Sequence, residues 1–308
     1  MYKFSIGLIF ISFFTVSLNA QNDLEQRAFD KLNKRNFSGA VLDFNQILIL
    51  NPENVKVLCG RADAKNNLGK YDEALSDVNK AISIDINYAD AYVLKGDILF
   101  NQKDYDNALK SYNEALQKRN SPNQALIGKS KVLNQQGNTK DAYKILDDAI
   151  SKNPSSAEFY YARGLLNNTK EKYSKALQDF DKAFSLNPDQ NVFNLYLNRG
   201  VAYYNLEEYS SAIDDFNKAI EVDANNATAF HSRGLAYYDN GDFKEAVSDF
   251  LKSDELNPNN QFTYFNLGMA YYKLEDVDNA CLYFHKSCKL GNTNACKMII
   301  MNCDTKIR

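Results

Sequence analysis

Four cysteines near the end of the chain are the residues whose type and spacing most clearly predict covalent chemistry. They are Cys281, Cys288, Cys296 and Cys303. The inner pair and the outer pair are both symmetric about Asn292. A helical hairpin that turns at Gly291-Asn292 would bring Cys288 opposite Cys296, and Cys281 opposite Cys303 two turns further away. Paired thiols of this kind form disulfides when a protein is exported to an oxidising compartment.

Other uses of these thiols fit a helical hairpin poorly. Residues seven apart on one helix are separated by about 10 Å, whereas the Cα atoms of a disulfide lie roughly 4.4–6.8 Å apart. The same axial offset disfavours the crossed pairing and a tetrahedral zinc site built from all four thiolates. We therefore predict the disulfides Cys288–Cys296 and Cys281–Cys303, a cap helix over about residues 293–303, and no metal site. Cys59, far upstream, is predicted to be a half-buried thiol.

The rest of the sequence contains few residues or motifs that are typical of an active site. The sequence holds two histidines, His231 and His285, and it lacks a P-loop, a G-x-S-x-G motif and a pair of histidines at metal-ligand spacing. Its net charge of −3 creates no field that would attract nucleic acid. The sequence therefore predicts neither an enzyme nor a cofactor, and no nucleic-acid partner.

The composition favours long helices. Only 5 prolines and 13 glycines occur in 308 residues, and 44% of the residues are hydrophobic. A search for internal repeats then shows a regular period. Small residues recur 34 residues apart, with one step of 36, at Ala40, Ala74, Ala108, Ala142, Ala176, Ala212, Ala246 and Ala280.

Each of these alanines belongs to a longer pattern. A large apolar residue follows four positions later, as in Phe216 and Phe250, and another small residue comes twelve positions earlier, as in Gly200 and Gly234. This spacing marks one face of a helix that approaches a second helix closely. The five prolines all fall between repeats, at Pro52, Pro122, Pro154, Pro188 and Pro258. Their placement agrees with helix pairs that end at these points.

The pattern resembles the tetratricopeptide repeat. The segment Arg233-Gly234-Leu235-Ala236-Tyr237-Tyr238, followed by Gly241-Asp242-Phe243 and Ala246, is similar to the consensus of that family. The resemblance covers roughly residues 22–294. It implies an all-α, right-handed superhelical solenoid of about eight helix-turn-helix repeats with a concave, ligand-binding inner face. The repeats are expected at about residues 21–54, 55–88, 89–122, 123–156, 157–192, 193–226, 227–260 and 261–294, with a cap helix and tail over 295–308.

A column of basic residues precedes the small residues of the first helices. It consists of Arg27, Arg61, Lys95, Lys129, Arg163, Arg199 and Arg233, with Leu267 in the last repeat. The five repeats that carry arginine are the five with aspartate sixteen residues later. We therefore expect an Arg–Asp pair between the two helices of these repeats, because a guanidinium matches a carboxylate in shape and charge. A phosphate-binding stripe is the weaker alternative.

The cysteine hairpin has a resemblance of its own. The segment Cys288–Cys296 (CKLGNTNAC) resembles the linker of Sel1-like repeats, in which a disulfide joins two helices across a turn. This resemblance implies the same inner disulfide as the spacing does.

The repeat geometry assigns a candidate partner-binding groove to first-helix residues that the core pattern leaves free. The set is mainly polar in the N-terminal half and apolar or aromatic in the last three repeats, with Tyr204, Tyr238 and Tyr272 at one position in succession. The alternative is that these tyrosines pack against neighbouring repeats. The candidates are Asn66, Asp97, Phe100, Lys131, Asn134, Tyr161, Leu165, Asn168, Leu197, Asn198, Val201, Tyr204, His231, Leu235, Tyr238, Phe265, Asn266, Met269 and Tyr272.

The N-terminus has the features of a secretory signal peptide. Lys3 precedes the apolar run Phe4 to Leu18, which is short for a bilayer span, and Ala20 is the expected cleavage point. An uncleaved anchor is the alternative, and no transmembrane segment is predicted after signal removal. We expect an exported protein of a periplasm or cell envelope, either retained there or released. Resemblance to exported repeat proteins of this kind favours a bacterial-type envelope.

Taken together, these features predict an interaction scaffold or assembly factor that binds a segment of another protein, within an envelope complex. The asparagines, Asn198 and Asn266 among them, would hold the backbone of the bound segment by amide hydrogen bonds. A self-associating structural solenoid of the envelope is the alternative, and its sign would be oligomers that depend on groove residues.

Overall fold

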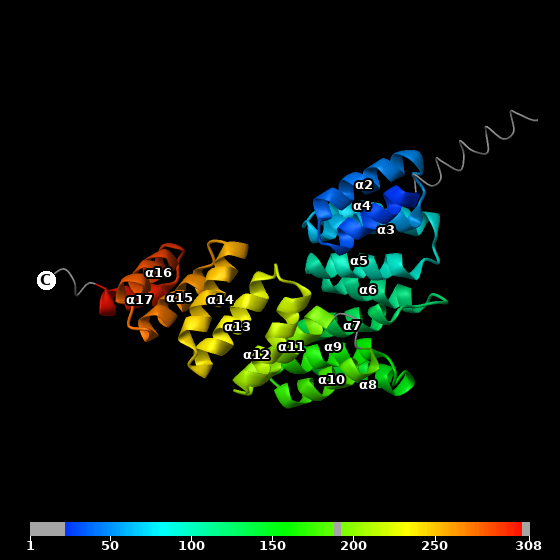
Figure 1. Cartoon of the computed structure of the whole chain (residues 1–308). Helices are drawn as coiled ribbons and strands as arrows, with labels where there is room; N and C mark the ends of the chain where they lie inside the picture. Colours follow the sequence, from blue (N-terminus) through cyan, green and yellow to red (C-terminus); the bar gives the residue numbers. More distant parts are fainter. Residues whose placement is uncertain (1–21, 188–191, 304–308) are drawn as a thin grey trace, which may run out of the picture. The chain divides into compact units, whose positions relative to one another are not determined.

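The computed structural model describes residues 22–187 and 192–303, and every regular element among them is an α-helix (Figure 1). The predicted signal peptide and the loop at 188–191 lie outside these residues. The chain divides into two compact units, residues 1–152 and 153–308. Each unit is a stack of helix pairs, so the predicted all-α repeat solenoid is confirmed.

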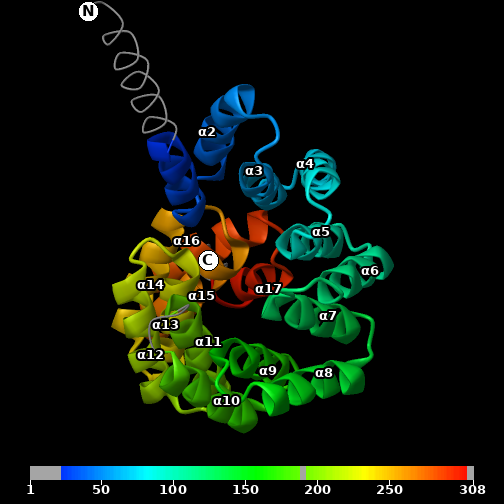
Figure 2. The ribbon, with the colours of Figure 1, turned by 90° about the vertical axis from the view of Figure 1, so that its right-hand side faces the viewer.

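Unit 1 holds the first four helix pairs. Residues 22–33 form a helix that pairs with α2 (Phe37–Leu50). The next three pairs are α3 (Val55–Asn67) with α4 (Tyr71–Ile84), α5 (Ala89–Asn101) with α6 (Tyr105–Leu116), and α7 (Asn123–Gln135) with α8 (Thr139–Lys152). The first helices α3, α5 and α7 lie on one side of this stack, and the second helices α4, α6 and α8 lie on the other (Figure 2).

Unit 2 holds four more pairs and a final helix. The pairs are α9 (Ala157–Thr169) with α10 (Tyr173–Leu186), α11 (Val192–Asn205) with α12 (Tyr209–Val222), α13 (Ala227–Asn240) with α14 (Phe243–Leu256), and α15 (Gln261–Lys273) with α16 (Val277–Lys289). The final helix is α17 (Thr293–Asn302), which packs on α16. Successive first helices contact one another within each unit.

A ring-on-glycine contact sets the distance between the helices of a pair. In α13, a Cβ atom added to Gly234 would lie 2.7 Å from Cε1 of Phe250 on α14, and Gly164, Gly200 and Gly268 face Phe180, Phe216 and Phe284 in the same way. All four rings are at most 1% exposed. The glycine costs helix propensity, so it is present because the ring of the second helix fills the space that a side chain would occupy.

The turn between the two helices of a repeat requires one residue in the left-handed region. Gly69, Gly137 and Gly241 occupy this position with φ between 74° and 93°. In the other five repeats the position holds a residue other than glycine, at φ between 57° and 66°: Arg35, Lys103, Glu171, Glu207 and Glu275. Such residues cost roughly 1–2 kcal/mol each relative to a right-handed conformation, and the packing of the helix pair outweighs this cost.

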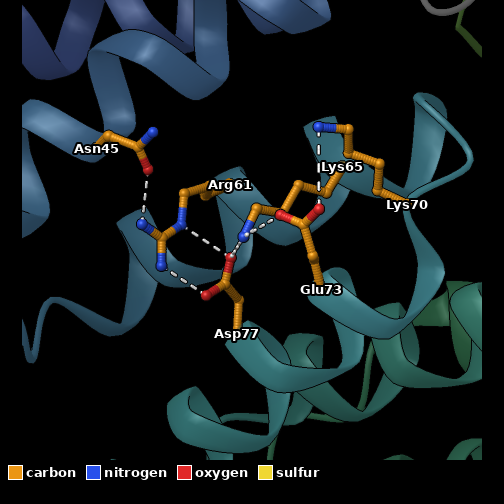
Figure 3. A network of polar contacts seen from close by, with 6 residues as sticks. All are labelled: Asn45, Arg61, Lys65, Lys70, Glu73 and Asp77. Carbon is orange, nitrogen blue, oxygen red and sulfur yellow. Dashed lines mark hydrogen bonds and ion pairs between the residues drawn. The ribbon is translucent and has the colours of Figure 1, made fainter.

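The five predicted Arg–Asp pairs are all present. In each of them the guanidinium donates Nε and Nη2 hydrogen bonds to the carboxylate at 2.6–3.2 Å. The five aspartates are only 4–6% exposed, so each carboxylate is buried with its charge compensated. Figure 3 shows this arrangement for Arg61 and Asp77.

The arginines also join one repeat to the one before it, a role that was not predicted. Arg61 Nη1 donates to Asn45 Oδ1 of α2 at 2.7 Å (Figure 3). Arg199 Nη1 donates to Asp181 Oδ1 of α10 at 2.7 Å, and Arg233 Nη1 donates to Asn217 Oδ1 of α12 at 2.6 Å. Each of these guanidinium groups therefore connects three helices.

The position one turn after the arginine supplies a further donor to the same aspartate. Lys65 Nζ lies 2.9 Å from Asp77 Oδ2 (Figure 3), and Lys31 Nζ lies 2.7 Å from Asp43 Oδ2. In the fifth repeat, Asn167 Nδ2 donates to Asp179 Oδ2 at 2.9 Å. These donors explain how a carboxylate can be buried without an unpaired oxygen.

Both predicted disulfides are present. Cys288 is bonded to Cys296, and Cys281 to Cys303, so α17 is linked covalently to α16 at both of its ends. The Cα–Cα separations of 4.9 and 5.7 Å fall in the normal range. The likeness of this hairpin to Sel1-like repeats stays a prediction.

Replacing Asp215 by asparagine should destabilise the protein. The change removes the charge that Arg199 compensates at a site where the Asp215 side chain is only 7% exposed. A loss of about 1–3 kcal/mol in the free energy of unfolding is expected. Urea unfolding followed by circular dichroism measures it, with the exposed neighbour Asp214→Asn as control. Equal stability of the two variants would contradict the importance of the pair.

Replacing Gly234 by alanine should also destabilise the protein, although alanine is the better helix former. Its Cβ would overlap the Phe250 ring, and overpacking of this kind costs about 1–3 kcal/mol. The double variant Gly234→Ala/Phe250→Leu provides the control, because the smaller side chain makes room for the added methyl group. If the effects of Gly234→Ala and Phe250→Leu on the free energy of unfolding simply added in the double variant, the ring-on-glycine contact would not explain why this position is glycine.

Candidate functional site

All of the predicted partner-binding residues lie on first helices. Those of unit 1 are on α3, α5 and α7, and those of unit 2 are on α9, α11, α13 and α15. Most of them are half-buried. The concave groove itself stays a prediction.

In unit 1 two of the predicted asparagines are engaged within the chain. Asn66 is 8% exposed, and its Oδ1 accepts a hydrogen bond of 3.0 Å from Asn101 Nδ2 on the next first helix. Asn134 Oδ1 accepts one of 3.0 Å from Thr139 Oγ1. Lys131, in contrast, is exposed. Of the polar residues predicted to bind a partner in this unit, Lys131 is therefore exposed to solvent, whereas Asn66 is buried.

Asp97 has a structural partner that the sequence did not suggest. The hydroxyl of Tyr112 donates a 2.7 Å hydrogen bond to Asp97 Oδ1, in a repeat whose second helix carries tyrosine where others carry phenylalanine. Burial raises the pKa of Asp97, although the Tyr112 hydrogen bond and Lys131 oppose this. Burial and the nearby Asp97 also raise the pKa of Asp63. Phe100 packs on Tyr105 with ring centroids 5.6 Å apart.

In unit 2 the apolar candidates cover the core rings of their own repeats. Tyr161 and Leu165 pack beside the cluster that contains Phe180, and Phe265 and Met269 beside that of Phe284. Leu197, Val201 and Tyr204 do the same at Phe216, and Leu235 and Tyr238 at Phe250. Each side chain is partly exposed, so these residues form a semi-apolar surface with the core directly beneath it.

Polar candidates in unit 2 connect successive first helices. Asn198 Nδ2 donates to Tyr161 Oη at 3.2 Å, and Asn168 Nδ2 donates to the Asn198 carbonyl at 2.9 Å. Burial raises the pKa of Tyr161 to about 12, so it stays a neutral hydroxyl at physiological pH. If Asn198 also forms the predicted amide hydrogen bond to a partner backbone, it must do so while these two bonds are present.

His231 is the centre of a similar link between α13 and α15. Its Nδ1 lies 3.1 Å from Thr263 Oγ1, and its Nε2 lies 3.4 Å from Asn266 Nδ2. Burial lowers the pKa of His231, and no carboxylate contributes to the shift. An amide N–H donor at Nε2 suits the neutral ring, so the geometry and the pKa direction agree on a structural, uncharged histidine.

The three successive tyrosines differ in their surroundings. Tyr204 packs on Tyr209 with centroids 5.8 Å apart, and its hydroxyl bonds to Asp239 of the next first helix. Tyr238 packs on Phe243 at 5.4 Å. Tyr272 has Val277 at the corresponding position and is 40% exposed. The first two tyrosines therefore have packing partners on the second helix of their own repeat, and the third is open.

The structure shows a pocket at Tyr272 that the sequence analysis missed. It has a volume of about 590 Å³ and includes Val277 and Met301 together with Glu275, Asp276 and Asp278. The sequence does contain a sign of this difference. The residue five positions after Phe100, Tyr204 and Tyr238 is aromatic in each case, whereas the residue five positions after Tyr272 is Val277.

The described residues give no sign of a metal or redox centre. Among them, no group of three or more His, Cys, Asp or Glu side chains is arranged to hold a metal ion. Burial and the nearby Asp90 and Asp77 raise the pKa of the Cys59 thiol to about 12, so this thiol is not activated. Within the described part of the chain, no helix has the length and apolar character needed to cross a membrane.

Comparison with protein-family models agrees with this architecture. Two tetratricopeptide-repeat models match, one at residues 200–241 and 234–275 and the other at residues 55–87 and 263–298. A model described as the TT21 fifth ARM repeats domain matches residues 89–188. The matched segments fall within the helical repeats described above.

The chain contains tetratricopeptide repeats in both units.

Solved structures with the same repeat fold include the Cut9–Hcn1 hetero-tetramer of the APC/C, at a TM-score of 0.62 and 18% identity. That match covers 79% of this chain and 48% of the other, so the chain spans about half the length of that relative. Two structures of MamA also match. A double mutant from RS-1 has a TM-score of 0.51 at 20% identity, covering 55% of this chain and 94% of that one. MamA from residue 41 to its end, from Desulfovibrio magneticus RS-1, has a TM-score of 0.50 at 21% identity, covering 52% and 90%. At these identities the likeness shows the tetratricopeptide-repeat fold alone. No curated protein matches the sequence.

The buried, neutral His231 predicts a pH effect on the stability of this tetratricopeptide-repeat protein. A histidine whose folded-state pKa is lowered stabilises the fold fully above its unfolded pKa of about 6.5, and this contribution is lost as the pH falls toward the folded pKa. The NMR titration of His231, assigned with the His285→Gln variant, should have a midpoint below about 6.5. Stability should fall between pH 7 and pH 5 by less in His231→Gln than in wild type. A midpoint at or above the unfolded value would contradict the assignment.

Proposed function

We propose that the protein is an exported interaction scaffold, or assembly factor, that binds a segment of a partner protein on the first-helix face of unit 2. The observation that carries this proposal is the semi-apolar surface formed by α9, α11, α13 and α15. There, aromatic and aliphatic side chains from four successive repeats are partly exposed beside amide groups. Surfaces with aromatic residues and a polar rim are typical of protein-binding sites.

The tetratricopeptide-repeat fold supports an interaction role over catalysis. Proteins with this fold are typically non-enzymatic scaffolds, and solenoids of repeats expose extended surfaces for other proteins. Cut9, which is similar in fold, was solved in a hetero-tetramer with Hcn1. We accordingly propose a binding function without a catalytic one.

Export to a cell envelope is supported by two features. The N-terminal segment has the composition of a signal peptide, and the two disulfides of α16 and α17 require an oxidising compartment to persist. We propose that the protein works in a bacterial-type envelope as part of a complex, after removal of residues 1–20.

Site-specific photo-crosslinking tests the proposed surface. The photoreactive amino acid p-benzoylphenylalanine is placed at Tyr161 or Tyr238 on the first-helix face, where it keeps an aromatic ring. The matched controls place it at Gln178 or Ser248, exposed positions of the second helices α10 and α14. In the envelope fraction of cells that make the protein, adducts with a distinct partner should form from the first pair of positions and not from the second pair.

Three outcomes would contradict the proposal. Adducts from Gln178 and Ser248 alone would place the partner on the other face. Adducts that contain only a second copy of the chain would support a self-associating solenoid. Absence of the protein from the envelope fraction would contradict export. Circular dichroism of each variant confirms that the fold is kept.

A further inference from the structure

The outer face of α2 differs from that of the other second helices. It consists of Leu42, Gln46 and Ile49, which lie on one side of the helix because they are spaced four and three residues apart. Leu42 is 63% exposed and Ile49 is 79% exposed. At these two positions the second to seventh repeats hold only serine, glutamine or charged residues. The position of Gln46 is charged in all seven other repeats, where it holds Lys80, Glu114, Asp148, Lys182, Lys218, Lys252 and Lys286.

Helix α2 also presents no charge to solvent. Its one ionisable side chain is Asp43, which is 4% exposed and paired with Arg27. In the sixth repeat, by contrast, the positions of Gln46 and Ile49 hold the ion pair Lys218–Glu221. The terminal repeats of a solenoid normally have a polar outer surface, which keeps the protein soluble. An apolar, uncharged face on the first repeat therefore marks an interaction surface.

The absence of charge on α2 narrows the choice of partner. Helices that lie on a lipid surface carry lysine and arginine on their polar side, and α2 has no basic residue. A strongly charged protein segment would find no complementary charge on this face. A second copy of the chain fits the face well, because two uncharged surfaces do not repel each other when they meet.

The spacing of the outer face is also self-complementary. Two α2 helices can pair antiparallel about a two-fold axis that passes between Asn45 and Gln46. Leu42 of each copy then faces Ile49 of the other. Asn45 Oδ1 accepts a 2.7 Å hydrogen bond from Arg61 Nη1 within the chain, which leaves the Asn45 amide N–H groups to donate across the axis to Gln46 Oε1 of the second copy.

We infer that the outer face of α2 is a homodimer contact, in which the α2 helices of two copies pack antiparallel. The apolar pairs of Leu42 with Ile49 supply the attraction, and the central amides fix the register. One helix from each copy makes a small interface, below the roughly 1,200 Å² that stable complexes bury, so the dimer is reversible with a dissociation constant on the order of 10–100 μM. This contact lies on unit 1, so it is a second surface beside the one proposed for the partner protein.

Sedimentation velocity of the exported protein over about 1–300 μM tests the contact. Wild type should shift from monomer to dimer in this range. Leu42→Lys/Ile49→Lys places four cations in the contact and should weaken dimerisation at least about tenfold. The matched control Ser76→Lys/Ser83→Lys makes the same change at the equivalent exposed positions of α4 and should leave dimerisation unchanged. A monomer at all concentrations, or equal effects of the two double variants, overturns the inference.

Photo-crosslinking identifies the occupant in cells. With p-benzoylphenylalanine at Gln46, an adduct of twice the mass of the chain should form, and the equivalent position Lys80 of α4 should give none. Absence of that adduct, or adducts only with another protein or with residues 1–20 of the same chain, would overturn the inference. Flotation on phosphatidylethanolamine–phosphatidylglycerol vesicles that Leu42→Lys/Ile49→Lys abolishes would assign the face to a lipid surface instead.

These outcomes are separate from those of the proposed function. If the protein stays monomeric while partner adducts form at Tyr161 and Tyr238, the dimer inference is wrong and the scaffold function stands. If the dimer forms through α2 and no partner adducts form at Tyr161 and Tyr238, the surface proposed for the partner is wrong and the dimer contact stands.

Discussion

In the repeats of unit 2, the contact between a second-helix ring and a first-helix glycine is the constraint on which the rest of the repeat depends. With Phe216 against Gly200, or Phe250 against Gly234, the two helices lie close enough for a guanidinium on one to reach a carboxylate on the other. This Arg–Asp pair is largely buried. It is favourable only because its two hydrogen bonds have good geometry and because the remaining N–H donors of the arginine find partners in the preceding repeat. In these repeats helix distance, ion pair and repeat stacking act together, whereas the pairs Arg27–Asp43 and Arg61–Asp77 form beside Ala28 and Ala62 without the glycine.

The fourth repeat shows what happens when these contacts are missing. It has Ser130 where others have glycine, Leu146 where others have a ring, and Lys129 with Ile145 in place of the Arg–Asp pair. Ser130 Oγ donates to the Ala142 carbonyl at 3.1 Å, and Lys129 Nζ donates to Asn113 Oδ1 at 2.8 Å. Helices α7 and α8 are thus linked to each other by a single hydrogen bond, and α7 is linked to the preceding repeat by an exposed one. Both links are weaker than a buried Arg–Asp pair.

Much of this architecture could be predicted from the sequence because it depends on residue types at fixed spacings. The alanine period, the Arg–Asp correlation and the symmetric cysteines each have one physical explanation, and the structure agrees with all three. The candidate site was predicted less well. Asn198, His231 and Tyr204 were chosen as free surface residues, yet each makes a hydrogen bond to a neighbouring first helix. Such bonds depend on the stacking of one repeat on the next, which residue types alone do not specify.

The surface left for a partner consists of what the packing does not use. Along the first helices from α9 to α15 this is the outer part of half-buried side chains, and Tyr272, beside Val277, is 40% exposed. The exposed part of the first-helix face is therefore set by the same contacts that hold the repeats together.

Hydrogen–deuterium exchange of the free protein, resolved by peptide, tests the central claim most directly. If the ring-on-glycine contact and the Arg–Asp fork hold each repeat together, α7 and α8 should exchange their amides faster than α9 and α10, which have both contacts and also lie at one end of a unit. Equal or slower exchange in α7 and α8 would mean that other interactions stabilise the repeats, and would contradict this account.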